Sequence, residues 1–288
     1  QGHYVTVIDI RDPQNRVEKV NYIKGDIRNQ ELMNKLTRSV NTVYHFAAIV
    51  SVPLCQKDPI ESYDVNFTGT VRVLEAIRHA NEKDNKKIRL IFASTAALYG
   101  SKGDDGRALK EEDVASDFSS FYAAQKHASE KAIFLYNTCF GIPALCFRFF
   151  NVYGPGQDPS SPYSGVITIF NRLAREGKNL PLNGGGQQTR DFISVYDIAK
   201  ACALALDLPS DKLKAQTANL GTNHSITVQE LARMIIKITK TNSQPISAPF
   251  RDGDVVHSKA DITRARELIA FKPSYDLEKG LSELLSVN

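Results

Sequence analysis

The stretch IRLIFASTAALYG, residues 88–100, indicates the fold class of this chain. Its first part, Ile88 to Phe92, is a short apolar run that predicts a buried parallel strand. Similar runs predict strands at residues 4–10, 20–23, 42–46 and 144–149, and amphipathic segments predict helices at 29–38, 60–80 and 119–138. Short strands that alternate with helices indicate an α/β fold with a doubly wound parallel sheet.

The second half of the chain loses this alternation after Asn151. We expect helices at residues 165–176, 195–206, 227–240, 261–270 and near Leu277, strands at 191–194 and 218–220, a turn at Gly184 to Gly186 and a further segment at 245–250. We therefore predict two domains, residues 1–150 and a smaller substrate-binding lobe at 151–288. Some elements near residues 188–220 are expected to return to the main sheet.

Size and composition argue against several classes of function. The chain has 288 residues, of which 42% are hydrophobic, so it can bury a large core. Its net charge of +4 and its scattered lysines and arginines predict no binding to nucleic acid or membranes. The histidines and the four cysteines (Cys55, Cys139, Cys146 and Cys202) lack ligand spacing, which predicts no metal site. With no signal peptide and no bilayer-spanning run, we expect a cytoplasmic protein.

A tyrosine and a lysine, Tyr122 and Lys126, stand four residues apart in the predicted helix at 119–138. This spacing places both side chains on one helical face. A nearby ammonium favours the phenolate, and a tyrosine tuned in this way can take a proton from a hydroxyl and return it. The pair therefore indicates catalysis. The alternative is a surface tyrosine beside a solvated lysine, because so short a motif is common.

Three strand ends carry residues suited to a dinucleotide. Asp9 is placed to bind two ribose hydroxyls and to repel a 2′-phosphate, which favours NAD over NADP. Asp26 and Ile27 follow the next strand and could contact adenine. The small residues of Phe46-Ala47-Ala48 let a dinucleotide approach the backbone. The alternatives are a turn at the first site, a turn with a helix N-cap at the second and core packing at the third.

Two hydroxyl side chains, Ser94 and Thr95, follow the strand at residues 88–92. At the carboxyl end of a strand they can bind the same substrate oxygen that Tyr122 deprotonates. The alternative is that these hydroxyls cap a turn.

Taken in order, Thr95, Tyr122 and Lys126, with the alanine-rich strand end before them, resemble the extended short-chain dehydrogenases of the NAD-dependent epimerase/dehydratase family, which act on nucleotide sugars. The resemblance covers essentially the whole chain. It implies a Rossmann domain that binds NAD at residues 1–150, and a UDP-sugar as substrate.

Three further stretches resemble the substrate-binding segments of this family. They are FRFFNVYGP at residues 147–155, TRDFISVYD at 189–197 and RDGD at 251–254. By this resemblance Asn151 and Arg251 contact the diphosphate, Arg190 belongs to the uridine- and phosphate-binding strand, and Asp254 lies in the same site.

Within the family, Ala96 and Ala97 favour epimerisation, because resembling dehydratases and decarboxylases carry an acidic residue there. Ser258 stands where glucose-specific relatives carry a bulky tyrosine, and it leaves space for an acetamido group. Gln157 and Ser51 also resemble the subgroup that accepts N-acetylhexosamines. The resemblance thus implies 4-epimerisation of UDP-N-acetylglucosamine and UDP-N-acetylgalactosamine. The alternatives are a surface serine at 258, a UDP-glucose or UDP-glucuronate 4-epimerase, and a non-catalytic relative that binds nucleotide sugars.

By the resemblance, the family's glycine-rich phosphate loop, G-x-x-G-x-x-G, should lie between a first strand and a first helix upstream of Gln1. The printed sequence therefore does not include it. This loop and its helix supply backbone donors to the pyrophosphate. We expect that the missing segments precede Gln1 in the complete protein, and that the chain as printed binds NAD poorly. The alternative is a degenerate member of the family.

The predicted helices at residues 60–80 and 119–138 resemble those that pair two subunits into a four-helix bundle in this family. The resemblance therefore implies a homodimer.

Overall fold

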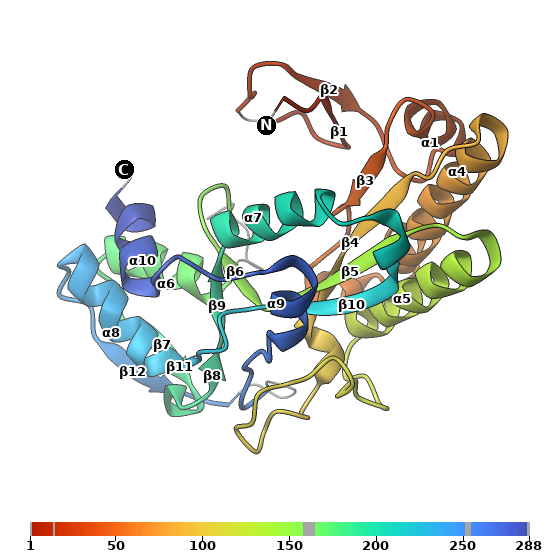
Figure 1. Ribbon diagram of the computed structural model, residues 1–288. Helices are drawn as coiled ribbons and strands as arrows, with labels where there is room; N and C mark the ends of the chain where they lie inside the picture. The colour runs from red at the N-terminus through yellow and green to blue at the C-terminus, as the bar shows by residue number, and fades with distance from the viewer. Residues whose placement is uncertain (1, 14, 158–164, 251–254, 287–288) are drawn as a thin grey trace. The chain divides into compact units, whose positions relative to one another are not determined.

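The chain forms two compact units in the computed structural model, which describes residues 2–13, 15–157, 165–250 and 255–286. The first unit contains Gln1–Ala93, Ser120–Cys146 and Pro209–Gln216, and the second contains Ser94–Ser119, Phe147–Leu208 and Thr217–Asn288. Figure 1 traces the elements of both units along the chain. The domain boundary at residue 150 stays a prediction, because a compact unit is not by itself a segment that folds alone.

Parallel strands build the sheets of the first unit. β1 (Val5–Asp9) pairs with β2 (Val20–Lys24) in a two-stranded sheet. A second sheet has the order β10-β5-β4-β3, made of β3 (Thr42–His45), β4 (Arg89–Thr95), β5 (Ala144–Phe149) and β10 (Lys214–Leu220). β3 and β4 are parallel, and the last residues of β4, β5 and β10 belong to the second unit. The predicted α/β class with a parallel sheet is confirmed.

The first strand is exposed, so the prediction that it is buried was wrong. Val5 is 45% and Val7 is 37% exposed, and only Ile8 packs against the core of the unit. Within the part of the chain that the structure describes, β1 pairs with β2 alone. A strand with one partner leaves apolar side chains in solvent that a central strand would bury.

The first unit contains five α-helices and one π-helix among its described residues. They are α1 (Gln30–Thr37), α2 (Val52–Lys57), α3 (Pro59–Tyr63), the π-helix η1 (Asp64–Thr68), α4 (Gly69–Asp84) and α5 (Phe121–Phe140). The Ser120 hydroxyl accepts a hydrogen bond from the Ala123 amide and starts α5, and Gly141 ends it at a positive φ of 66°. The helix predicted at 60–80 is therefore three segments, because a π-helical turn interrupts it.

The core of the first unit lies between α1, α4, α5 and the strands. Its buried side chains include Met33, Leu74, Ile77, Phe92 and Ile133. Close contact favours glycine at position 69, where an added Cβ would lie 2.6 Å from Cδ1 of Ile27. This packing fixes the start of α4 against the loop after β2.

The second unit contains small sheets and five α-helices among its described residues. The helices are α6 (Val166–Arg175), α7 (Val195–Leu206), α8 (Val228–Thr239), α9 (Thr263–Ile269) and α10 (Leu277–Ser286). Its short 3₁₀ turns are η2 (Ala96–Tyr99) and η3 (Gly184–Gly186), whereas η4 (Ser210–Lys212) belongs to the first unit. Thr227 and Glu230 form a reciprocal capping box at the start of α8.

Paired short strands complete this unit. β6 (Asn151–Tyr153) is parallel to β9 (Phe192–Ser194), and β7 (Leu180–Asn183) is parallel to β12 (Pro245–Ala248). β8 (Thr189–Arg190) is antiparallel to β11 (Ile226–Thr227). Most of the elements predicted after residue 151 therefore exist, with bounds that differ by a few residues.

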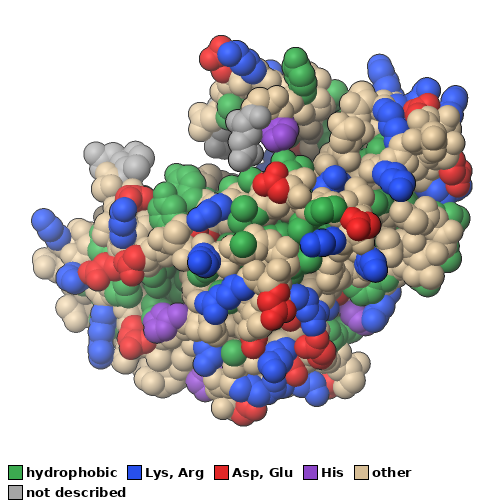
Figure 2. Space-filling model, viewed as in Figure 1, with side chains coloured by type: hydrophobic (Ala, Val, Ile, Leu, Met, Phe, Trp, Pro, Cys, Tyr) green, Lys and Arg blue, Asp and Glu red, His purple; other side chains and the backbone are tan. Residues whose placement is uncertain are grey.

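Acidic and basic side chains are interspersed on the face seen in Figure 2. Among the described residues, none of the helices combines the length and apolar character needed to cross a bilayer.

Candidate active site

Tyr122 and Lys126 are both buried on α5 in the first unit. Lys126 is 2% exposed and Tyr122 is 9% exposed. The cap at Ser120 fixes where the helix begins, so the spacing of four residues places both side chains on its buried face. The alternative of a solvated surface pair is wrong for these two residues.

The Lys126 ammonium is held against the end of β4. Its Nζ donates a hydrogen bond of 2.8 Å to the carbonyl oxygen of Ala93 and lies 4.5 Å from the ring centroid of Phe92. Burial lowers the pKa of Lys126 to about 8, while Cys146 and Glu130 act to raise it. Ser94 and Thr95 directly follow Ala93 in the same strand.

His45 ends β3 and is part of a buried hydrogen-bond chain. Its Nε2 lies 2.9 Å from Oγ1 of Thr70, whose hydroxyl donates to the carbonyl oxygen of Asn66 at 2.7 Å. Because that hydroxyl has a single proton, the histidine ring must donate from Nε2. Burial lowers the pKa of His45 to about 3, so the ring is neutral near pH 7.

The three residues after His45 are accessible. Phe46 is 47% exposed, Ala47 is exposed and Ala48 is partly exposed. Core packing, which is the alternative for this segment, describes His45 and not the three residues that follow it. Small side chains at the open end of β3 fit the close approach of a dinucleotide.

Asp9, predicted to bind ribose, lies exposed at the end of β1. Its Oδ1 accepts a hydrogen bond of 2.9 Å from the Arg11 amide. This local contact is the one expected of a turn-forming aspartate, which is the alternative given for this residue. Its role toward NAD stays a prediction.

Asp26, predicted to contact adenine, is engaged by Arg28. The Nη2 of Arg28 lies 2.7 Å from Oδ2 of Asp26, and its Nη1 also pairs with Glu61 and Asp64. Arg28 lowers the pKa of the Asp26 carboxyl. The side chain of Ile27 is buried in the core, so only its backbone is available to a cofactor.

Ser51 has a structural contact in the first unit. Its hydroxyl accepts a hydrogen bond of 3.2 Å from the Leu54 amide and caps α2. Its predicted contact with substrate stays untested.

In the second unit, Ser94 is buried and Thr95 is partly buried. The Oγ1 of Thr95 accepts a hydrogen bond of 3.1 Å from the Ala97 amide, so this hydroxyl caps η2. The capping alternative thus describes Thr95, and a cap that uses one lone pair leaves the hydroxyl proton to donate elsewhere.

Several predicted substrate residues lie around β8 and β9. The Asn151 amide donates to the carbonyl oxygen of Asp191 at 3.0 Å, and the Ser258 amide donates to that of Thr189 at 3.2 Å. Arg190 donates from Nη1 to the same Thr189 carbonyl at 2.9 Å. These contacts bring residues that are far apart in the sequence close to the two short strands β8 and β9.

Ser258 is 8% exposed, so the alternative of a surface serine is wrong. Gln157 is exposed, and its Oε1 accepts a hydrogen bond of 2.5 Å from the Thr168 hydroxyl. Arg251 and Asp254 lie outside the described residues.

Asp191 organises this region, and the sequence analysis did not single it out. Its carboxylate accepts hydrogen bonds from the Thr222 amide at 2.8 Å, the Asn223 amide at 3.0 Å and the Ala260 amide at 3.1 Å. Burial raises its pKa. One sequence signal could have identified Asp191: an acidic residue next to the apolar residues of the stretch 189–197.

A second buried network surrounds Tyr99, the last residue of η2. Arg148 donates from Nη1 to the Tyr99 hydroxyl at 3.1 Å and to the Glu111 carbonyl oxygen at 2.7 Å. The Tyr99 hydroxyl donates to Oδ1 of Asn219. This network holds the segment that follows Thr95 in a single arrangement.

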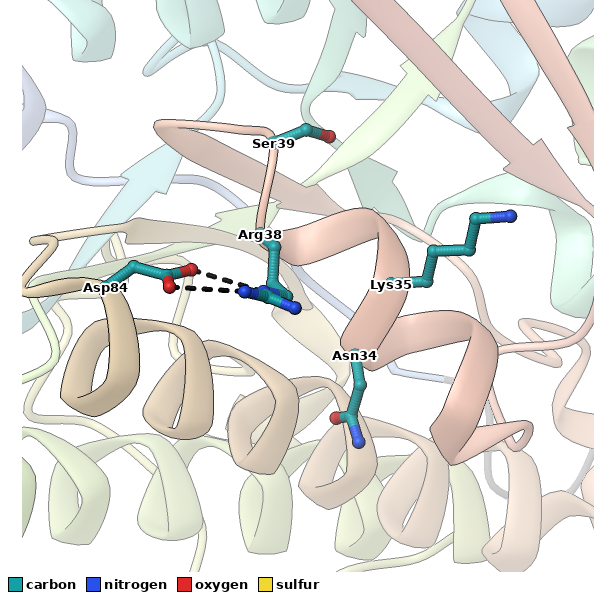
Figure 3. A pocket seen from close by; sticks show the side chains of 5 residues that line it. All are labelled: Asn34, Lys35, Arg38, Ser39 and Asp84. Atoms are coloured by element: carbon teal, nitrogen blue, oxygen red, sulfur yellow. Dashed lines mark hydrogen bonds and ion pairs between the residues drawn. The ribbon is translucent and has the colours of Figure 1, made fainter.

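A hollow on the first unit lies apart from all of these residues. It is lined by Asn34, Lys35, Arg38, Ser39 and Asp84. Figure 3 shows the Arg38 guanidinium paired with the Asp84 carboxylate, with Nε and Oδ2 3.3 Å apart. None of the predicted site residues lines it, so we do not assign it to the active site.

Comparisons with known proteins agree with the resemblance. The sequence profile of the NAD dependent epimerase/dehydratase family matches residues 1–221. The chain is 31% identical to a UDP-N-acetyl-alpha-D-glucosaminuronate decarboxylase of Bacillus cytotoxicus, over 99% of this chain and 90% of that protein. It is 33% identical to a putative UDP-glucose 4-epimerase of Methanocaldococcus jannaschii, over 93% of this chain and 84% of that protein.

A solved structure extends this comparison to the fold. The UDP-N-acetylglucosamine 4-epimerase of Methanobrevibacter ruminantium, in complex with UDP-N-acetylmuramic acid, is 30% identical and has a TM-score of 0.86. The match covers 98% of this chain and 89% of that one. The names of the three relatives cover two reactions, epimerisation and decarboxylation.

Proposed function

This chain belongs to the NAD dependent epimerase/dehydratase family, and we propose that it is a 4-epimerase that interconverts UDP-N-acetylglucosamine and UDP-N-acetylgalactosamine. The observation that supports this most is the burial of Lys126 against the Ala93 carbonyl, next to Ser94 and Thr95 in β4. That contact orders the lysine on the same helix face as Tyr122. A buried cation of this kind favours the phenolate.

When bound, NAD would supply a reversible acceptor for the hydride at C4 of the sugar. The accessible residues Phe46, Ala47 and Ala48 would contact it, with Asp9 at the adenosine ribose and Asp26 and Ile27 near the adenine. Lys126 would hold the nicotinamide ribose. The exposure of residues 46–48 fits this assignment.

Tyr122 takes the proton of the 4-hydroxyl and later gives it back to the 4-keto sugar. Thr95, with Ser94, hydrogen-bonds the reacting oxygen. Asn151, Arg190 and Arg251 hold the UDP, while the sugar turns over to present its other face.

The choice of sugar follows from residues near β8. Ser258 is buried, and its amide bonds to the Thr189 carbonyl. Its side chain is much smaller than the tyrosine of glucose-specific relatives, and this difference in size is the basis for assigning the acetamido group to this position. Gln157, Ser51 and Asp254 complete the proposed substrate contacts. A UDP-glucose or UDP-glucuronate 4-epimerase is the alternative, and the likeness to the Methanocaldococcus jannaschii protein favours it.

We also propose a cytoplasmic homodimer that pairs through α4 and α5. Leu135 and Phe140 of α5 are 63% and 49% exposed. Exposed apolar side chains of this size support a surface on this helix that a second subunit would cover.

The experiment is to supply the full-length protein and NAD with UDP-N-acetylglucosamine, UDP-N-acetylgalactosamine, UDP-glucose and UDP-glucuronate, and to compare kcat/KM. We expect the two acetylated sugars to be the best substrates. Tyr122→Phe should lower kcat by about 100-fold or more, because it removes the acid–base group. Tyr136→Phe is the matched control, since its hydroxyl lies on the same helix and bonds to Glu75.

Full activity in Tyr122→Phe would refute the catalytic assignment. Binding of UDP-sugar without turnover, with NAD bound, would instead support a non-catalytic nucleotide-sugar-binding protein.

A further inference from the structure

A chain of buried side-chain amides connects the loop after β3 with the helix that carries Tyr122 and Lys126. Gln125 is fully buried on α5. Its Oε1 accepts a hydrogen bond of 2.8 Å from Nδ2 of Asn66, and its Nε2 donates one of 2.8 Å to the Ser62 hydroxyl. Both functions of this amide are therefore used.

Asn66, in the π-helix η1, continues the chain to the loop. Its Oδ1 accepts a hydrogen bond from the Ile49 amide at 2.7 Å, and its Nδ2 donates to the Ile49 carbonyl oxygen at 3.0 Å. The side chain thus binds both backbone groups of the residue that follows Ala48. The two protons of its amide go to Ile49 and Gln125.

The backbone of Asn66 contributes in the same place. Its carbonyl oxygen accepts hydrogen bonds from the Ser129 hydroxyl at 3.0 Å and from the Thr70 hydroxyl at 2.7 Å. Ser129 lies one turn after Gln125 on α5, so the helix contacts η1 at two successive turns.

A buried network in which each of these side chains has a hydrogen-bond partner allows few alternative arrangements. Asn66, Gln125, Ser62 and Ser129 are all buried. Loss of one partner would leave another polar group unpaired away from water. The network therefore fixes the loop and the helix relative to each other more sharply than apolar packing does.

We propose that Gln125, acting through Asn66, is a positioning residue that holds the segment Phe46–Ile49 in register with Tyr122 and Lys126. The proposal rests on the proposed function, in which this segment contacts NAD and α5 carries the acid–base group. Gln125 takes no part in proton or hydride transfer itself. Its role is to keep the two groups of residues at a constant separation.

The first test is hydrogen exchange of the peptide that spans residues 46–51. Gln125→Leu removes both hydrogen bonds of the amide at similar size, and we expect exchange of this peptide to become about 10-fold faster. Gln56→Leu is the matched control, because Gln56 is exposed on α2 in the same unit, and it should change nothing. Unchanged exchange in a folded Gln125→Leu protein would overturn the proposal.

Ser62→Ala gives the same test if Gln125→Leu does not fold. It removes the acceptor of the Gln125 Nε2 proton, together with the hydrogen bond that the Ser62 hydroxyl donates to the Pro59 carbonyl oxygen, and should accelerate exchange of residues 46–51 by about threefold. No acceleration in this variant would likewise count against the proposal.

The second test separates positioning from substrate binding. In Gln125→Leu we expect kcat to fall about 10-fold, because small displacements of reacting groups are costly, while KM for the UDP-sugar stays within about twofold. A raised KM at unchanged kcat would contradict the proposal. If the unmodified protein turns over no UDP-sugar, the proposed function fails, and the exchange experiment still decides whether Gln125 holds the loop.

Discussion

The Lys126 ammonium and the Ala93 carbonyl oxygen lie 2.8 Å apart, so the charged end of the lysine is tied to the backbone of β4 just before Ser94 and Thr95. Phe92 supplies the face of its ring to the same ammonium at 4.5 Å. A carbonyl dipole and an aromatic ring stabilise a buried cation without neutralising it. The charge therefore remains available to a neighbouring phenolate.

This environment predicts the alkaline limit of activity. Burial lowers the pKa of Lys126 to about 8, and the proposed mechanism needs its charged form. We expect kcat to hold below pH 8 and to fall about tenfold per pH unit well above it, since the protonated fraction falls in that proportion. A pH–rate profile from 6.5 to 9.5 measures this. Constant kcat up to pH 9.5 would show that the ammonium is not required.

His45 predicts a loss of stability in acid. Its pKa is lowered to about 3 in the folded protein, against about 6.5 in an unfolded chain. Below pH 6.5 the unfolded chain therefore binds a proton that the folded protein excludes, and stability falls as the pH falls toward 3. The slope from this residue approaches about 1.4 kcal/mol per pH unit.

The check is urea unfolding at pH 7 and pH 4.5 for the parent protein and for His45→Gln. Gln keeps a donor for the Thr70 hydroxyl but cannot gain a charge. We expect its free energy of unfolding to fall by about 2 kcal/mol less than that of the parent between these pH values. Equal losses in the two proteins would place the acid sensitivity elsewhere.

Asp191 predicts a stability effect in the second unit. Asp191→Asn replaces one of the two carboxylate oxygens by an NH₂ group, which cannot accept a hydrogen bond. At least one of the backbone amides of Thr222, Asn223 and Ala260 therefore loses its acceptor. We expect a loss of about 2–3 kcal/mol in the free energy of unfolding. Asp207→Asn, at an exposed position after α7, is the control and should stay within about 0.5 kcal/mol. Similar unfolding midpoints for the two variants would contradict this.

Ser258 predicts sugar preference. Ser258→Tyr fills the space assigned to the acetamido group, and we expect the kcat/KM ratio of UDP-N-acetylglucosamine to UDP-glucose to fall at least about 10-fold. Ser258→Ala keeps that space and should leave the ratio near its starting value. A ratio that does not move in Ser258→Tyr would remove this residue from the sugar pocket.

Much of the α/β framework could be predicted from local pattern. Residues 42–46, 88–92 and 144–149 are short, mainly apolar runs, which are typical of parallel strands inside a sheet, and each contains most or all of the residues of a strand or its first part. β1 has a similar pattern but is exposed, because burial depends on partners far away in the sequence. The order of the sheet, with β10 beside β5, is likewise a long-range property.

The candidate site shows the same contrast between local patterns, which could be predicted, and long-range contacts, which could not. The motif at Tyr122 and Lys126 identified the buried pair because helical spacing is a local rule. Gln125, which lies between them, carries no local signal, since its partners Asn66 and Ser62 come from another part of the chain. The interruption of α3 and α4 by a π-helix was also missed, because no residue type marks such a turn.

Because of the π-helix at Asp64–Thr68, the number of residues between Ser62 and Thr70 is also constrained. Each residue of an α-helix turns the chain by about 100°, and a π-helical turn accommodates one more residue than an α-helical turn. Deleting one residue between Ser62 and Thr70 would therefore swing one of these side chains about 100° around the axis relative to the other. Substitutions on the outer face of this run leave that angular relationship intact, whereas a single insertion or deletion breaks it.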